Sequence, residues 1–308
     1  MKKLLAKFTI LISFIFALVL LLEFFSMKDS TKAFVADLTN SSDYLSEGSG
    51  TSDIIPMIES VREIDDTTVL VIGDSIARQM FTAMKDDCPE ARIACVNAAI
   101  NISGQYMLAC EYLDNHQEVT DVWLFAHPLT LTRTYDLDLG YGYAVMPFAI
   151  EGSLHYLEDE TIDQMASVYG RWSLNAGFAS LVDRSPVNRK LFFGYMRMHN
   201  SEYEQANAYE ITSLYILKLK ELCENRNVTF HFYSSPSTEY YREKIEETRA
   251  DFEKSSLSDL YPDYLDSVYY FPTEWSEDST HFGGDYATRE VYDRVVSEAY
   301  TEFFMDLP

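Results

Sequence analysis

The sequence predicts an α/β protein built on a parallel β-sheet with helices on both of its faces. Short runs of apolar residues alternate with segments in which apolar residues recur every three or four positions. The first pattern is typical of buried strands, and the second is typical of amphipathic helices. Strands that are separated by helices favour a parallel sheet. The chain has 308 residues, of which 47% are hydrophobic, so it is long enough to bury a full core.

The predicted elements follow one another in order from residue 69 onward. Residues 69–72 (VLVI) form the first predicted strand. The next residues with helical spacing are Ala77, Met80, Phe81 and Met84. Further strands are predicted at 91–96, 121–126 and 228–233, and further helices at 105–116 and 211–222. A final amphipathic helix is predicted from Tyr292, Val295, Val296, Ala299 and Phe303. In such sheets, functional groups gather at the carboxyl ends of the strands.

Residues 1–26 predict an N-terminal transmembrane signal anchor. Three lysines, Lys2, Lys3 and Lys7, precede a run from residue 8 to residue 22 that contains no charge. This stretch is close to the roughly 20 residues that a membrane-spanning helix needs, and its basic flank is expected to stay in the cytoplasm. The remaining chain would then be extracytoplasmic. The alternative is a signal peptide cleaved near AFVA at 33–36, which would release a secreted protein.

Residues 27–64 are predicted to form a flexible polar tether, and residues 65–308 a single folded domain. The tract at 39–53 (TNSSDYLSEGSGTSD) is rich in Ser and Gly and has no apolar periodicity. Within the domain, the segment at about 130–205 interrupts the alternation and predicts a partly helical insertion rich in aromatic residues. Tyr and Trp suit stacking on carbohydrate, because they combine an apolar face with a polar edge. Ordinary core packing is the alternative.

The charge balance excludes a nucleic-acid binder. The formal net charge is −25, from 49 acidic and 24 basic residues, and no Lys/Arg cluster is present to neutralise phosphates. A neutral or cationic partner fits this balance, and binding to a polyanion would need a local basic patch. The alternative is that the charge only keeps the domain soluble. The cysteines, Cys88, Cys95, Cys110 and Cys223, show no CxxC spacing and are either bridged or buried as free thiols.

The tripeptide Gly73-Asp74-Ser75 stands where the first predicted strand ends and the first predicted helix begins. A hydroxyl at this place lies beside the free N–H groups of the helix, which stabilise a developing oxyanion. A serine becomes a nucleophile only with a positioned base and a carboxylate that orients the base. Asp278 and His281 offer both, three residues apart and just before the last predicted helix.

Each of these residues also has a purely structural interpretation. Ser75 could cap the helix, Asp278 could hold a turn, and His281 could be a core or surface histidine. A metal site would need a third ligand beside His281 and Asp285, and none is evident, so no metal is predicted.

Together, the two motifs resemble the SGNH (GDSL-like) hydrolase family over about residues 65–308. Members of this family are esterases and acyltransferases with a flavodoxin-like three-layer α/β sandwich. Their Gly-Asp-Ser block is similar to residues 73–75, and their Asp-x-x-His block is similar to residues 278–281. The resemblance implies that Ser75 is the nucleophile, that His281 is the general base and acid, and that Asp278 orients the imidazole.

The middle blocks of the family are less similar to this chain. The resemblance implies an oxyanion hole formed by Ser75 and by the backbone N–H of Gly104, in NISG at 101–104. The family's Gly-x-Asn-Asp block should follow the third strand, but LFAHPLTL at 124–131 contains His127 and no Asn. Either His127 donates the oxyanion hydrogen bond, or that donor is missing.

The implied function is that of an extracytoplasmic serine esterase or O-acyltransferase without a cofactor. Its substrate would be an acyl ester, above all an acetyl ester, of an envelope or secreted polysaccharide. A membrane anchor is common among the cell-envelope members of the family, and in a transferase an integral-membrane partner would deliver the acyl group. The alternative is a glycan-binding or assembly protein that keeps the fold and lacks a competent oxyanion hole.

Overall fold

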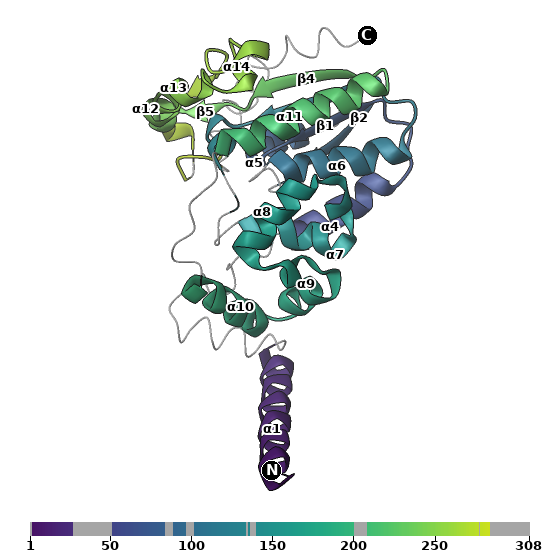
Figure 1. Cartoon of the computed structure of the whole chain (residues 1–308). Coiled ribbons are helices and arrows are strands. Elements are labelled where there is room, and N and C mark those ends of the chain that lie inside the picture. Colours follow the sequence, from purple (N-terminus) through teal and green to yellow (C-terminus); the bar gives the residue numbers. More distant parts are fainter. Residues whose placement is uncertain are drawn as a thin grey trace.

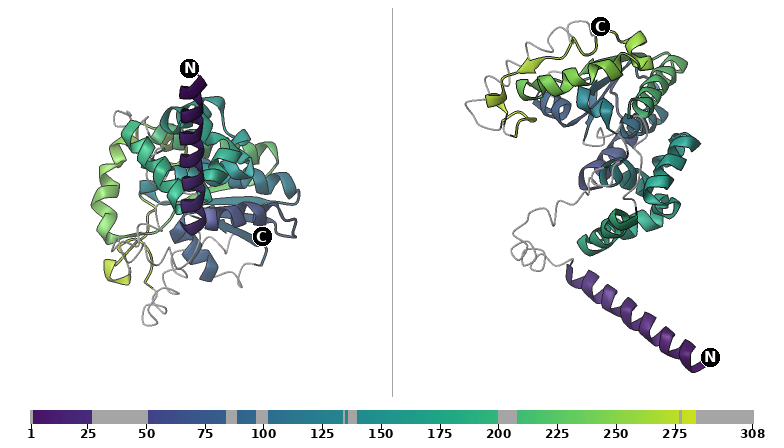
Figure 2. Two further views of the ribbon diagram at one scale, coloured as in Figure 1. Left: turned by 90° about the horizontal axis from the view of Figure 1, so that it is seen from below. Right: turned by 60° about the vertical axis from the view of Figure 1, so that its left-hand side comes forward.

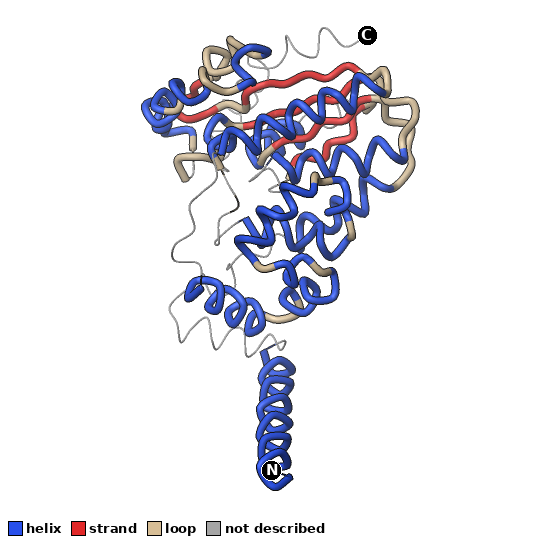
Figure 3. Tube along the Cα trace, in the orientation of Figure 1, coloured by secondary structure: helices blue, strands red, loops and turns tan. Residues whose placement is uncertain are grey.

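The centre of the molecule is a four-stranded parallel sheet with the strand order β2-β1-β3-β4 (red in Figure 3). The computed structural model describes residues 2–26, 51–83, 89–96, 102–133, 135, 140–199, 208–276 and 278–283. The strands are β1 (Val69–Gly73), β2 (Ala91–Cys95), β3 (Asp121–Ala126) and β4 (Thr229–Ser234). All four strands predicted from the apolar runs are therefore confirmed.

Both faces of this sheet are buried. Along β1, Leu70 and Ile72 belong to one apolar cluster, and Val69 and Val71 belong to another. This alternation is the two-residue period of a strand, whose side chains point to opposite faces. A strand that is covered on both faces needs apolar residues at every position, which explains the unbroken VLVI run.

Helices cover both faces, so the chain is an α/β protein with three layers (Figures 1 and 2). One face carries α5 (Ser75–Ala83), which contacts β1 and β2. The other face carries α6 (Ile102–Asn115) and α11 (Ala208–Asn225), which contact each other as well as the sheet. These helices correspond to the predicted segments at 77–84, 105–116 and 211–222. The helix predicted at 292–303 lies outside the described residues.

The tether predicted for residues 27–64 is wrong at its C-terminal end. Residues 51–62 form helix α4 (Thr51–Arg62), in which Ile54, Ile58 and Val61 are fully buried in the main core. These apolar residues recur at helical spacing, but the polar tract that precedes them hid the pattern. Arg62 fixes the end of α4 through ion pairs with Glu111 and Glu151, each at 2.7 Å.

The insertion predicted at about 130–205 is helical and packs into the same core. It contains α7 (Met146–Glu151), α8 (Asp159–Tyr169), α9 (Ala176–Asp183) and α10 (Pro186–His199), with short turns between them: η2 (Pro128–Thr132), η3 (Gly140–Val145), η4 (Ser153–Tyr156) and η5 (Arg171–Leu174). Tyr141 and Tyr169 are fully buried, and Tyr141 donates a hydrogen bond to the carbonyl of Ser173. Core packing therefore accounts for these aromatic residues.

The segment after β4 builds a small separate layer at one end of the sheet (yellow-green in Figure 1). A two-residue strand, β5 (Ser237–Thr238), pairs in parallel with β6 (Tyr270–Phe271). Between them lie η6 (Glu239–Tyr241), α12 (Arg242–Glu247), α13 (Arg249–Phe252) and α14 (Ser256–Leu260), and η7 (Thr273–Trp275) follows. This layer brings Ser276 and residues 278–283 to the edge of the sheet where β1 ends.

The predicted N-terminal anchor coincides with helix α1 (Lys2–Ser26). Within the described ranges, no helix reaches the combination of length and apolar character that crossing a membrane requires.

The cysteines contribute apolar packing. Cys95, Cys110 and Cys223 are buried free thiols, whereas Cys88 lies outside the described residues. Burial raises the pKa of the Cys110 thiol to about 12, so this group stays protonated at neutral pH.

Candidate active site

Ser75 is the first residue of α5 and follows the end of β1 by two residues. The turn between them needs a glycine, because a Cβ at Gly73 would lie 2.6 Å from the Cβ of Ala77 and 2.9 Å from the carbonyl oxygen of Phe125. The chain can therefore pass close to β3 and turn sharply into the helix. This turn places the Ser75 hydroxyl at the carboxyl edge of the sheet.

Asp74 holds this turn in place through both of its carboxylate oxygens. One oxygen accepts hydrogen bonds from the N–H groups of Ile76 and Ala77, at 3.0 Å each, and so caps α5. The other accepts a hydrogen bond from the N–H of His127, at 2.7 Å, just after β3. Burial raises the pKa of Asp74, while these hydrogen bonds act in the opposite direction. Asp74 thus joins the two central strands at the point where Ser75 lies.

The structure brings the three predicted triad residues together. The Ser75 Oγ lies 2.8 Å from Nε2 of His281, and Nδ1 of His281 lies 2.7 Å from Oδ2 of Asp278. Because Asp278 accepts the proton on Nδ1, Nε2 is left to accept the hydroxyl proton of Ser75. The two hydrogen bonds form one continuous line from carboxylate to hydroxyl, which is the geometry of a nucleophile with an oriented base.

The turn that carries Asp278 and His281 is closed by Asp278 itself. Its Oδ1 accepts hydrogen bonds from the N–H groups of Thr280, at 2.9 Å, and His281, at 2.7 Å. Partial burial acts to raise its pKa, but the hydrogen bonds from His281 and Thr280 outweigh this effect and lower the pKa to about 2. Ser279 adopts a left-handed conformation with φ of 67°, and its carbonyl accepts a hydrogen bond from Thr238. Asp278 is therefore ionised at neutral pH.

Gln79 connects the helix that begins with Ser75 to the loop that carries His281. It lies four residues after Ser75, and its amide pairs with the backbone of Phe282. The Phe282 N–H donates to Oε1 at 3.1 Å, and Nε2 donates to the Phe282 carbonyl at 3.3 Å. Ser276 adds a hydrogen bond from its hydroxyl to the carbonyl of His281. These contacts fix the separation between Ser75 and His281.

His127 is buried beside this site, but both of its ring nitrogens already have partners. Its Nδ1 accepts a hydrogen bond from the N–H of Leu129 at 3.2 Å, so the proton is on Nε2, which lies 3.0 Å from Oγ of Ser237. Burial, together with the charge of Arg133, lowers the pKa of His127 to about 4. The ring is therefore neutral at pH 7 and has no free N–H to offer an oxyanion. Of the two sequence alternatives, this arrangement favours a missing third donor.

The other predicted oxyanion donors differ in their positions. The N–H of Ser75 has no acceptor within the described residues and stands at the N-terminus of α5, where a developing negative charge is stabilised. Gly104 is buried in the first turn of α6 and is not among the described residues that line the cleft at Ser75. Ser75 therefore presents a free N–H at the cleft, whereas Gly104 is buried away from its described lining.

The triad opens into a cleft of about 470 Å³. Its described lining comes from the start of α5, from η2 and the residues around it, and from the layer after β4. The lining residues are Asp74, Ser75, Ile76, His127, Leu129, Thr130, Thr132, Arg133, Tyr143, Tyr241, Lys244, Thr280 and His281. Among the aromatic residues of the insertion, Tyr143 alone belongs to this described lining. The predicted sugar-stacking role therefore has support at one position of the insertion.

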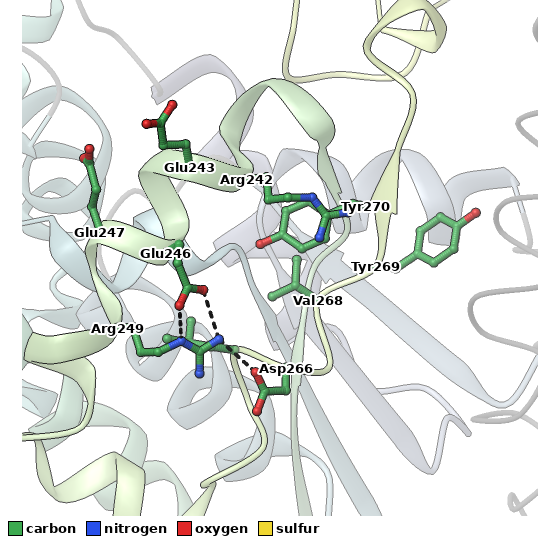
Figure 4. A pocket seen from close by; sticks show the side chains of 10 residues that line it. Arg242, Glu243, Glu246, Glu247, Arg249, Asp266, Val268, Tyr269 and Tyr270 are labelled. Carbon is green, nitrogen blue, oxygen red and sulfur yellow. Dashed lines mark hydrogen bonds and ion pairs between the residues drawn. The ribbon is translucent and has the colours of Figure 1, made fainter.

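A larger hollow of about 770 Å³ is lined by residues of α12, by Arg249 and by residues from the segment 265–270 (Figure 4). Both of its guanidinium groups have partners: Arg249 pairs with Glu246 and Asp266, and Arg242 pairs with Glu239 and lies 3.9 Å from the ring centre of Tyr270. Its described lining includes no Ser, Cys or His side chain. We therefore assign the candidate site to the smaller cleft.

Several residues of the site were missed by sequence reasoning. The spacing of Gln79 from Ser75 places both on one helix face, but nothing in the sequence reveals that its partner is Phe282, 203 positions away. Arg133 and Lys244 carry no motif, and only the fold brings them to the same cleft.

Comparison with models of protein families, with curated proteins and with solved structures finds no match to this chain.

Proposed function

We propose that this protein is a serine esterase or O-acyltransferase that acts on acyl esters of a carbohydrate. The observation that carries the proposal is the unbroken line of hydrogen bonds from Asp278 through His281 to Ser75. A serine hydroxyl has no need of such partners in a structural role, since Asp74 already caps the helix. The solvent-open cleft above the serine supports the same conclusion.

In the proposed reaction, Ser75 Oγ attacks the ester carbonyl while its proton moves to Nε2 of His281. The ionised Asp278 stabilises the imidazolium that forms and keeps the ring in the required orientation. The developing oxyanion accepts a hydrogen bond from the N–H of Ser75. His281 then returns the proton to the departing sugar hydroxyl, and the acyl group remains on Ser75 as an ester.

The second half of the reaction determines the product. A water molecule or a second sugar hydroxyl gives its proton to His281 and attacks the acyl-serine. His281 then protonates Oγ as Ser75 leaves. Water as acceptor makes the protein an esterase, and a sugar hydroxyl makes it an O-acyltransferase. Both use the same three side chains.

A second candidate is a glycan-binding or assembly protein that retains the hydrolase fold. The observation that favours it is the engaged ring of His127, which leaves the oxyanion with fewer donors than the SGNH pattern provides. Loss of one such donor lowers turnover by about 100-fold to 1000-fold in known enzymes, which slows a triad without abolishing it. We therefore retain the enzyme as the first proposal.

The strand order β2-β1-β3-β4 is that of the flavodoxin-like arrangement, in line with the resemblance to SGNH hydrolases.

The cellular setting is proposed on the sequence alone. We propose an extracytoplasmic domain attached through the N-terminal segment, a polysaccharide as substrate and, for the transferase, an integral-membrane protein that delivers the acyl group.

The test compares the parent with Ser75→Ala, using the full chain purified in detergent. The substrates are 4-nitrophenyl acetate and an O-acetylated oligosaccharide, and both hydrolysis and acetyl transfer to free oligosaccharide are followed. We expect Ser75→Ala to lower kcat/KM by at least about 1000-fold, since removal of a triad member costs this much or more. The product ratio of the parent separates esterase from transferase.

The matched control is Ser180→Ala, which removes an exposed hydroxyl from α9 and is expected to keep the parental rate. A fluorophosphonate should label the parent at Ser75 and leave Ser75→Ala unlabelled. If the variant keeps the parental rate, the mechanism is wrong. If the parent shows neither turnover nor labelling but binds the oligosaccharide, the binding protein is the correct assignment.

A further inference from the structure

Two positively charged side chains line the cleft of Ser75. Arg133 ends the short helix η2, and Lys244 lies on α12, so the two come from separate parts of the chain. Both are exposed at the cleft. This is unexpected in a chain with a net charge of −25, in which acidic residues outnumber basic ones 49 to 24.

Neither cation forms an ion pair within the described part of the chain. Many of the other described cations are paired with the surplus of carboxylates: Arg62, Arg92, Arg171, Lys218, Lys220, Arg226, Arg242, Arg249 and Lys254. Arg133 and Lys244 differ from these nine cations, because no described carboxylate pairs with them.

The described lining of the cleft also offers no carboxylate that could neutralise them. Among its described lining residues, Asp74 is the only acidic one, and backbone N–H groups already occupy both of its oxygens. Arg133 lies close enough to His127 for its charge to act on that ring. The positive charges of Arg133 and Lys244 are therefore not neutralised by the described lining, and they can attract an anion to the cleft of Ser75.

We propose that Arg133 and Lys244 bind an oxyanionic group, a carboxylate or a phosphate, on the sugar that carries the acyl ester. The substrate class is thus an acidic glycan, and this inference rests on the proposed function of Ser75. A guanidinium binds two oxygens of such a group at once, and an ammonium adds a point charge. The net negative charge of the whole chain had favoured a neutral or cationic partner, but the cleft reverses that expectation locally.

The acidic surface does not prevent this binding. At physiological ionic strength, the Debye length is about 8 Å, so carboxylates elsewhere on the molecule are screened from a group held in the cleft. A group in contact with Arg133 or Lys244 is screened much less. Arg133 and Lys244 therefore have a stronger effect on substrate preference than the distant carboxylates have.

The test measures kcat/KM of the full chain on three matched esters: methyl O-acetyl-glucoside, the corresponding glucuronate and the corresponding 6-phosphate. We expect one or both anionic esters to be preferred over the neutral one. Arg133→Gln and Lys244→Gln should each reduce this preference by roughly threefold to tenfold, through KM, and the double variant should abolish it. The anionic ester whose kcat/KM falls more in the two variants identifies the bound group as a carboxylate or a phosphate.

Arg242→Gln provides a matched control on the same helix. It removes the same charge, but the Arg242 side chain lies against the ring of Tyr270 (Figure 4) and is not part of the described lining of the Ser75 cleft, so the preference should stay unchanged. Equal kcat/KM for the neutral and both anionic esters, or a preference that survives in the double variant, would overturn the inference while leaving the proposed function intact.

A binding measurement separates the two proposals. In the Ser75→Ala background, the dissociation constant for a glucuronate oligosaccharide and for glucose 6-phosphate is measured by calorimetry. Weaker binding on Arg133→Gln or Lys244→Gln supports the anion site even if no ester is turned over. Binding that is unaffected by both substitutions contradicts it, whatever the activity of the parent.

Discussion

At the scale of single residues, His127 shows how burial and two hydrogen bonds define one protonation state. Leu129 donates to Nδ1, and Ser237 lies beside Nε2, so the neutral ring fits its surroundings. A protonated ring would have to break the bond from Leu129 and carry a charge while buried and close to Arg133. The residue that the sequence placed in an oxyanion hole is therefore a fixed structural element of the cleft wall.

This state predicts a loss of stability in mild acid. The pKa of His127 is lowered from 6.5 to about 4 in the folded chain, so between these values the unfolded chain binds the additional proton. The free energy of unfolding should therefore fall as the pH is lowered through this window, by about 3 kcal/mol in total. Urea unfolding at pH 7 and at pH 4.5 measures the effect.

The control for this prediction is His127→Asn, in which residue 127 cannot titrate. Its stability should decrease less than that of the parent over the same pH interval, because all other groups titrate alike in both proteins. If the free energy of unfolding fell equally in the parent and in His127→Asn, the titration of His127 would not contribute to the loss of stability, and the prediction would be wrong.

At the scale of elements, the amide of Gln79 couples α5 to the loop that carries His281. Gln79→Leu removes both hydrogen bonds to Phe282, and we expect kcat to fall by roughly 10-fold to 100-fold, because small displacements of catalytic groups are costly. KM should change little, since Gln79 does not line the cleft.

Two readouts distinguish this positioning role from a general loss of stability. The proton shared by His281 Nδ1 and Asp278 should give a downfield resonance in the parent that weakens in Gln79→Leu, and Gln79→Glu, which keeps one acceptor, should weaken it less. Gln117→Leu, an exposed glutamine on the loop after α6, serves as the control. Unchanged kcat in Gln79→Leu would contradict the coupling.

At the scale of the whole molecule, α4 is part of the fold. Ile54, Ile58 and Val61 are fully buried, and burial of each such side chain contributes about 1.5–3 kcal/mol. Their sum of about 5–9 kcal/mol is comparable to the total stability of a typical domain. We expect a chain that begins at residue 51 to fold and a chain that begins at residue 64 to be unfolded, as judged by circular dichroism and thermal melting. Cooperative melting of both chains would show that α4 is dispensable.

For the whole molecule, some features could be predicted from the sequence and others could not. The strands of the sheet were predictable, because a strand buried on both faces must be apolar throughout. The triad was predictable, because Gly73-Asp74-Ser75 and Asp278-x-x-His281 are local patterns. The state of His127 was not, since it depends on Ser237, 110 positions away, and the place of α4 was hidden by a neighbouring polar tract. The first case depends on a contact between distant segments, and the second on a local pattern that the polar tract obscured.

The distance along the chain between Ser75 and His281 has a consequence for biosynthesis. The two residues are 206 positions apart. At ordinary rates of translation, this interval corresponds to about 10–40 seconds during which the serine has emerged without its base. Under the proposed function, an unfinished chain is therefore chemically inert, and the order of synthesis alone protects neighbouring esters until folding is complete.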